Sequence, residues 1–228
     1  MAMVGIVSII PPIKNTMHTK KNRLPAMIYG LILLLGSTIM TVEWILVLPG
    51  YSLMEDLSRN HPVSKSQAHL LATMPGHIPE AARQRAAGLT LLGQWDQAQQ
   101  QQEKWLTLSP ADAYGYLRLS IIARMAKDTD TSARALEMAF GTGRHERELM
   151  LPRLLETVAQ WNRQEHSVRD MALNDLAMLW RWDRPRLTQS LPVNKAWPLY
   201  SRALSGTAAF AEAMTLRSTP QTKQQGNP

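Results

Sequence analysis

The chain has 228 residues, enough for one domain of ordinary size with a membrane anchor and tails, but too few for two large catalytic domains. Its low aromatic content of 6% and its many Ala, Leu, Gln and Arg residues favour helices over sheets, and the lack of cysteine excludes disulfides and thiolate chemistry. The net charge of +7 falls to +3 beyond residue 25, with 21 basic against 18 acidic residues, which argues against nucleic-acid binding.

Residues 26–48 are predicted to form a transmembrane helix. The sequence AMIYGLILLLGSTIMTVEWILVL contains one charge in 23 residues, and at about 1.5 Å per residue it spans a hydrocarbon core of roughly 30 Å. A cleaved signal peptide is the competing interpretation, but this apolar run is longer than a typical signal-peptide core and no A-x-A site follows it. The segment is therefore interpreted as an uncleaved signal anchor.

The charges beside this segment predict its direction. Residues 1–25 contain Lys14, Lys20, Lys21 and Arg23 and no acid, so the positive-inside rule places them in the cytoplasm. In a Gram-negative host, a single pass through the inner membrane would then put the chain from Tyr51 onward in the periplasm.

Two positions near the anchor allow alternative interpretations. Glu43 is the one ionisable residue in the predicted span, and it could pair with a partner helix or reach the headgroups near the end of the apolar run. Translation could begin at Met1 or at Met17, because MHTKKNRLPAMIYG would make an ordinary basic lead into the anchor.

After a linker over 49–78 with a short helix at 64–72, the pattern predicts helical hairpins. Pro79 opens a helix that runs to residue 92, Gly93 interrupts it, and a second helix over 94–108 ends before Pro110. The later expected segments are a turn at 128–131, helices at 148–162, 166–182, 195–204 and 207–216, and a disordered tail at 217–228. The predicted fold class is all-α.

The first hairpin resembles a tetratricopeptide repeat. Ala86, Leu89, Gly93, Ala98 and Pro110 match the repeat pattern in register, whereas Gln102 and Trp105 depart from it. The resemblance continues 34 residues later and weakens through 182. It implies an antiparallel helical-hairpin solenoid over 79–216 whose concave surface binds peptides or partner domains. The positions that match in the second repeat are Tyr116, Leu119, Ser120, Ala123, Ser132, Leu136 and Ala139.

No catalytic constellation is apparent in the sequence, so we expect no enzymatic activity, cofactor or metal. His145 with Glu146, and Glu165 with His166, are adjacent residues whose side chains would point apart on a helix, and exposed helix caps explain them more simply. Residues 141–144 lack the Gly-Lys-Ser/Thr ending of a phosphate loop and are interpreted as the loop between two hairpins.

The segment 180–186 is the candidate partner-binding site. It contains Trp180, Trp182, Arg184 and Arg186, and Trp and Arg dominate the binding energy of many protein interfaces. The alternative is structural: Trp180 would belong to the core, and the arginines would be solvated residues at the end of a helix.

These features predict a membrane-anchored scaffold or accessory subunit of a cell-envelope assembly. Exopolysaccharide synthesis or export is the specific hypothesis, because small anchored helical-repeat proteins are similar to accessory members of such systems. The expected partners are other membrane or periplasmic proteins and the lipid around one helix, with no nucleic acid. Two alternatives are an assembly or maturation factor for a periplasmic enzyme, and a membrane-anchored enzyme acting on glycan through Glu165 and His166.

Overall fold

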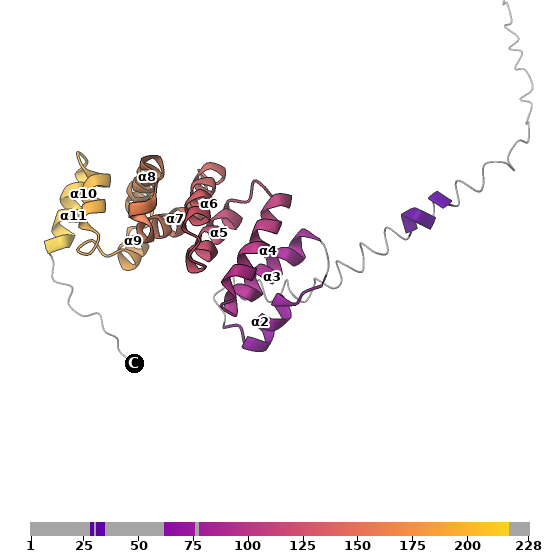
Figure 1. Ribbon diagram of the computed structural model, residues 1–228. Helices are drawn as coiled ribbons and strands as arrows, with labels where there is room; N and C mark the ends of the chain where they lie inside the picture. The colour runs from indigo at the N-terminus through magenta and orange to yellow at the C-terminus, as the bar shows by residue number, and fades with distance from the viewer. Residues whose placement is uncertain (1–27, 30, 35–61, 76–77, 219–228) are drawn as a thin grey trace, which may run out of the picture. The chain divides into compact units, whose positions relative to one another are not determined.

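The computed structural model describes residues 28–29, 31–34, 62–75 and 78–218 (Figure 1). The chain divides into two compact units, 1–45 and 46–228. In the first unit the described residues are helical and exposed. No helix within the described ranges is both long and apolar enough to cross a membrane. Most of the predicted span 26–48, including Glu43, and both candidate start sites lie outside the described residues.

Every regular element that the structure describes in the second unit is a helix, as the composition predicted. Successive helices pack pairwise, α3 against α4, α5 against α6, α7 against α8 and α10 against α11 (Figure 1). The elements are α2 (Lys65–Ala72), α3 (Pro79–Leu91), α4 (Trp95–Leu108), α5 (Ala113–Met125), α6 (Thr129–Thr142), α7 (Arg147–Ala159), η1 (Trp161–Arg163), α8 (His166–Trp182), α9 (Arg184–Ser190), α10 (Trp197–Leu204) and α11 (Ala208–Ser218).

Local capping explains where several helices begin. Ser64 and Gln67 form a capping box at the start of α2. Asp112 accepts a hydrogen bond from the Gly115 N–H at 2.9 Å and so caps α5. Asp183 accepts from the Arg186 N–H at 3.4 Å, and this cap starts α9, a helix that the sequence analysis did not predict. The candidate segment 180–186 is therefore a corner between two helices.

The turns after α3 and α5 share one hydrogen-bonding pattern. Gly93 has φ of 71° and Lys127 has φ of 67°, and the two residues are 34 positions apart. In each turn this residue donates to the carbonyl three residues back at 3.1 Å, and the next residue donates to the carbonyl five residues back at 2.9 Å. The second turn thus centres on Lys127, and the predicted turn at 128–131 is wrong because Asp128 already caps α6.

We expect Lys127→Gly to raise the free energy of unfolding by about 1 kcal/mol. Lysine is strained at positive φ, whereas glycine adopts this conformation at little cost. Urea unfolding of the full chain in detergent micelles, followed by circular dichroism, measures the change. Lys104→Gly, in the exposed interior of α4, is the matched control and should instead lower stability by about 1 kcal/mol. Equal losses in both variants would contradict the prediction.

Helix α2 lies within the predicted linker and packs closely on α3. The contact is between backbones: a Cβ at Gly88 would lie 2.6 Å from the Ala68 carbonyl oxygen and would also meet the Ala72 amide nitrogen. Leu71 is fully buried beside this contact. The position therefore requires glycine, and α2 extends the row of packed helices on the N-terminal side of α3.

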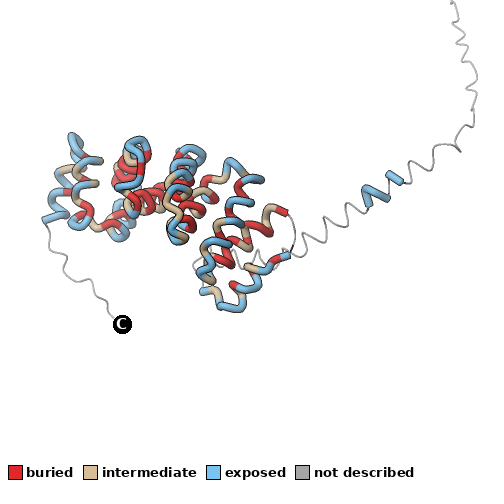
Figure 2. The backbone as a smooth tube through the Cα atoms, in the orientation of Figure 1, coloured by how far each residue is buried: buried red, intermediate tan, exposed pale blue. Residues whose placement is uncertain are grey.

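Three of the five residues that carry the resemblance are buried between α3 and α4, whereas Gly93 and Pro110 are exposed. Ala86, Leu89 and Ala98 lie in the interior around α3 and α4. Gln102 and Trp105, the two residues that depart from the repeat pattern, are also buried. Both donate hydrogen bonds to the beginning of the next hairpin. Gln102 Nε2 donates to the Gly115 carbonyl at 3.1 Å, and Trp105 Nε1 donates to Asp112 Oδ2 at 2.7 Å. Figure 2 shows the same distribution, with buried residues on the facing sides of the helices.

Candidate protein-interaction site

The corner between α8 and α9 separates the predicted binding residues into different environments. Trp180 is 4% exposed and packs edge-on against Tyr200, with ring centroids 5.6 Å apart. Arg184 lies 5.2 Å from the Trp180 ring and pairs with Glu212 of α11 at 2.7 Å. These residues join α8 and α9 to the last helices, as the structural alternative for Trp180 expected. Arg186 is exposed on α9.

Trp182 is the tryptophan of this segment that remains available for contact. It is 48% exposed, and the Arg147 guanidinium lies 4.3 Å from its ring centroid. Arg147 is the first residue of α7, so this cation–π contact holds the end of α8 against the beginning of α7. The contact also fixes the indole in one orientation, which lowers the entropy lost when a partner binds it.

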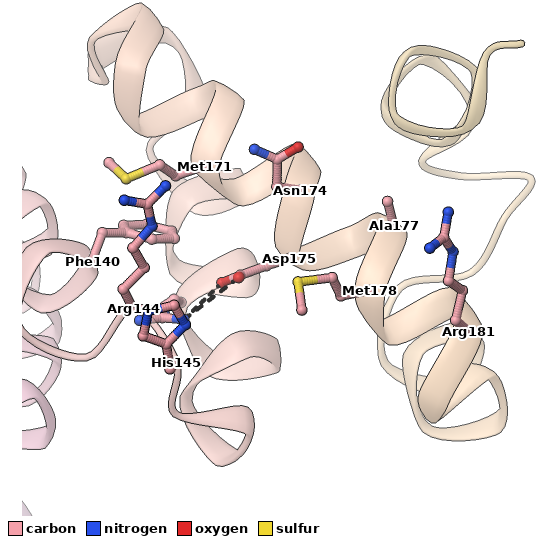
Figure 3. Close-up of a pocket in the computed structure, with 10 residues that line it drawn as sticks. Phe140, Arg144, His145, Met171, Asn174, Asp175, Ala177, Met178 and Arg181 are labelled. Carbon is pink, nitrogen blue, oxygen red and sulfur yellow. Dashed lines mark hydrogen bonds and ion pairs between the residues drawn. The ribbon is translucent and has the colours of Figure 1, made fainter. Parts of the chain in front are cut away.

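A pocket of about 420 Å³ opens between the end of α6, the loop that follows it, α7 and α8 (Figure 3). Part of its wall is apolar, built by Phe140, Met171, Ala177 and Met178. The rest is polar and mostly basic. The loop residues that line it, Arg144 and His145, lie three and two positions before Arg147, and Arg181 of α8 immediately precedes Trp182. The pocket and the Trp182–Arg147 contact are therefore formed by neighbouring parts of the chain.

Arg153 and Asp175 form a buried ion pair in this pocket. Arg153 is fully buried, and its Nη1 donates to the carbonyls of Gly143 at 2.6 Å and Ala139 at 3.3 Å. Its Nη2 lies 3.1 Å from Asp175 Oδ2 and donates to Oδ1 at 3.5 Å (Figure 3). The guanidinium also lies 4.7 Å from the Phe140 ring. Arg153 thereby joins the end of α6 to α8 through α7.

The hydrogen bonding of this pair is incomplete. Arg153 Nε and Asp175 Oδ2 are buried and have no hydrogen-bond partner, although Oδ2 lies within ion-pair distance of Nη2. Burial raises the pKa of Asp175 to about 6, and the attraction of Arg153 offsets only part of this effect. Because this pKa is higher in the folded than in the unfolded chain, the protonated carboxyl favours folding, and its contribution to stability is lost as pH rises through about 6.

This pocket was not predicted from the sequence, although the sequence contains a signal for it. Arg153 follows Leu149 by four residues on the buried face of α7. Asp175 lies between Ala172 and Leu179 at helical spacing on the buried face of α8. Two opposite charges at core positions of consecutive helices indicate a buried pair, but only if the two helices are known to pack face to face.

The pairs that the sequence analysis interpreted as caps are exposed. His145 and Glu146 lie in the α6–α7 connection, Glu165 precedes α8 without a side-chain capping bond, and His166 begins that helix. Within the described ranges, no group of three or more His, Cys, Asp or Glu residues could hold a metal ion. The described residues lining the pocket include no serine, threonine, cysteine or lysine that could act as a nucleophile.

Antiparallel helix pairs occur in many unrelated proteins, so the fold alone does not determine the function. Comparison of the chain with protein-family models, with curated proteins and with solved structures found no match.

Proposed function

We propose that the protein is a membrane-anchored interaction subunit that binds partner proteins through the surface around Trp182 and Arg147. The observation that carries this proposal is the half-exposed indole of Trp182, with the Arg147 guanidinium 4.3 Å from its ring centroid. The preceding residue, Arg181, lines the pocket. Trp and Arg are the residue types that most often dominate the energy of protein interfaces, above all when they are held in place before binding.

Two spacings of 34 residues support the resemblance to tetratricopeptide repeats. One is the recurrence of the same turn at Gly93 and Lys127. The other joins the first helices of successive pairs, where the Tyr114 hydroxyl donates to Glu148 Oε2 at 2.9 Å. Repeats of this kind expose continuous surfaces for partner proteins. We therefore propose a degenerate tetratricopeptide-like solenoid as the scaffold of the interaction surface.

The sequence supports a position in the cell envelope. Residues 26–48 have the length and apolarity of a single transmembrane helix, and the basic residues before them favour a cytoplasmic N-terminus. We propose that the helical domain lies in the periplasm of a Gram-negative bacterium and serves an envelope assembly, with exopolysaccharide synthesis or export as the specific hypothesis. This orientation would bring the Trp182 surface to periplasmic partners.

A crosslinked pull-down from membranes tests the proposal. The full chain would be compared with Trp182→Ala, and partners would be identified by mass spectrometry. We expect the recovery of specific partners to fall about tenfold, because truncating an interface anchor usually costs more than 1 kcal/mol. Leu108→Ala, which shortens an exposed apolar side chain at the end of α4, is the control and should retain the partners.

The identity of the partners separates the alternatives. Polysaccharide synthesis or export subunits would support the specific hypothesis, whereas a single soluble periplasmic enzyme would replace it with an assembly or maturation role. Absence of any specific partner would overturn the interaction proposal. Loss of glycan turnover on changing His166 to Ala would instead support the membrane-anchored enzyme.

A further inference from the structure

The pocket between α6, α7 and α8 is bordered by exposed polar side chains that have no partner among the described residues. Arg144, His145, Asn174 and Arg181 line it, and among the described residues none of these four side chains makes a hydrogen bond or an ion pair. The buried Nε of Arg153 and Oδ2 of Asp175 also lack hydrogen-bond partners. The four side chains are solvated, so the unsatisfied polar groups are the two buried atoms. Two buried atoms without partners, beside exposed charged groups that no protein group neutralises, indicate a site that binds a polar ligand.

The charge of the pocket indicates whether the ligand is positively or negatively charged. Arg153 and Asp175 form an ion pair within the wall, so Arg144 and Arg181 give the rest of the lining an excess of positive charge. Arg144 comes from the loop after α6 and Arg181 from α8, so the two guanidiniums belong to different walls of the pocket (Figure 3). Guanidinium groups bind carboxylates through paired, charge-assisted hydrogen bonds.

The apolar part of the pocket wall indicates which chemical group lies next to the carboxylate of the ligand. Met171 and Met178 are partly exposed on α8, and Phe140 of α6 contributes a buried ring to the lining. Thioether side chains adapt to aliphatic and aromatic groups but offer only weak acceptors to hydroxyl groups. A charged sugar would leave its hydroxyls poorly satisfied against this wall. An aliphatic side chain next to a carboxylate satisfies both parts of the pocket.

We propose that this pocket binds an acidic segment of a partner protein, with one carboxylate at Arg144, another at Arg181 and aliphatic side chains on Met171 and Met178. Figure 3 shows the two arginines at opposite ends of the lining, with residues of α8 between them. The inference rests on the proposed interaction function and specifies the chemistry of the partner. A volume of about 420 Å³ accommodates one or two side chains and is open to solvent along one side, so an extended peptide can cross it.

Fluorescence anisotropy with a labelled peptide tests this proposal on the full chain in detergent micelles. The probe is Gly-Leu-Glu-Glu-Leu-Gly, compared with versions that carry Gln for Glu or Ser for Leu. We expect Arg144→Gln and Arg181→Gln each to weaken binding on the order of tenfold, the usual effect of losing a hydrogen bond between charged groups. Arg134→Gln, an exposed change on α6 away from the pocket, is the matched control and should bind as the unchanged protein does.

The outcomes separate this inference from the proposed function. Weaker binding of both substituted peptides and of both pocket variants supports the acidic–aliphatic ligand. If the Gln peptide binds as tightly as the Glu peptide, the ligand is not recognised through its carboxylates. If both arginine variants bind the Glu peptide as tightly as the unchanged protein does, the peptide does not bind in this pocket. If the acidic peptide fails to bind while the pull-down still yields partners that depend on Trp182, the pocket inference fails and the interaction function stands. Peptide binding without any recovered partner leaves the pocket as a ligand site and removes the proposed function.

Discussion

Replacing Arg153 with methionine is expected to lower the free energy of unfolding by about 3–5 kcal/mol, the usual cost of removing one partner from a buried ion pair. The change leaves the Asp175 carboxylate buried without its counter-charge. It also removes the Nη1 group that donates to the carbonyls of Ala139 and Gly143 at the end of α6. Methionine fills a comparable volume, so the loss arises mainly from unsatisfied polar groups rather than from a cavity. Urea unfolding of the full chain in detergent micelles measures it.

The pH dependence of this loss identifies its cause. Without Arg153, the attraction that holds down the pKa of Asp175 is gone, so this pKa rises above its value of about 6 in the unchanged protein. At pH 5 the carboxyl is then protonated and neutral, and the variant should lose less stability than at pH 7.5, where burying a charged group is costly. A loss that is equal at both pH values would show that packing, and not charge, explains the effect.

Two further variants complete this test. Arg153→Met combined with Asp175→Leu removes both charges, and it should recover most of the stability that the single change loses. Arg134→Met on the exposed face of α6 is the matched control and should alter stability by less than about 0.5 kcal/mol. A double variant as unstable as Arg153→Met alone would contradict the role assigned to the uncompensated carboxylate.

Gly88→Ala is expected to destabilise the protein by about 2 kcal/mol, although alanine is normally the better helix former. The added Cβ would lie within 2.6 Å of the Ala68 carbonyl oxygen, so α2 must move away from α3. Moving α2 exposes Leu71, whose burial contributes about 2–3 kcal/mol. Urea unfolding gives the total change, and faster hydrogen exchange of the amides of 65–72 would locate it in α2.

Gly141→Ala is the matched control because nothing lies within 4 Å of the Cβ it would add. Gly141 is in the last turn of α6, and alanine there should stabilise the protein by about 0.5–1 kcal/mol through its higher helix propensity. We expect Gly88→Ala to lower the free energy of unfolding and Gly141→Ala to raise it. A gain in stability at both glycines would show that α2 does not pack tightly on α3 in solution.

The sequence predicted the helices well because their signals are local. Pro79, Gly93 and the apolar periodicity between them mark the first helix to within one residue of its observed end. The helix at 166–182 was predicted with the bounds that α8 has. The turn at Lys127 and the short helix α9 were missed, because lysine is unusual at positive φ and Asp183 begins a new helix directly after the last one ends.

The binding segment was predicted only in part, because exposure depends on distant contacts. Trp180 and Trp182 are two residues apart in the sequence, yet Tyr200 covers the first and the second remains half exposed. Helical geometry separates the two side chains by roughly 200° around α8. Trp180 continues the buried spacing of Leu173 and Leu176, which is a local signal for a core position. The partners of the two indoles, Tyr200 for Trp180 and Arg147 for Trp182, depend on how the helices pack.

The sequence by itself determined an all-helical domain, most of its helix boundaries and a candidate anchor, because periodicity, caps and apolar length act over a few residues. The tertiary structure alone decided that Arg153 meets Asp175, that Arg147 holds Trp182, and that a basic pocket opens beside them. These contacts join residues that are 22 or more positions apart on different helices. Their existence depends on how the faces of the helices approach one another in three dimensions.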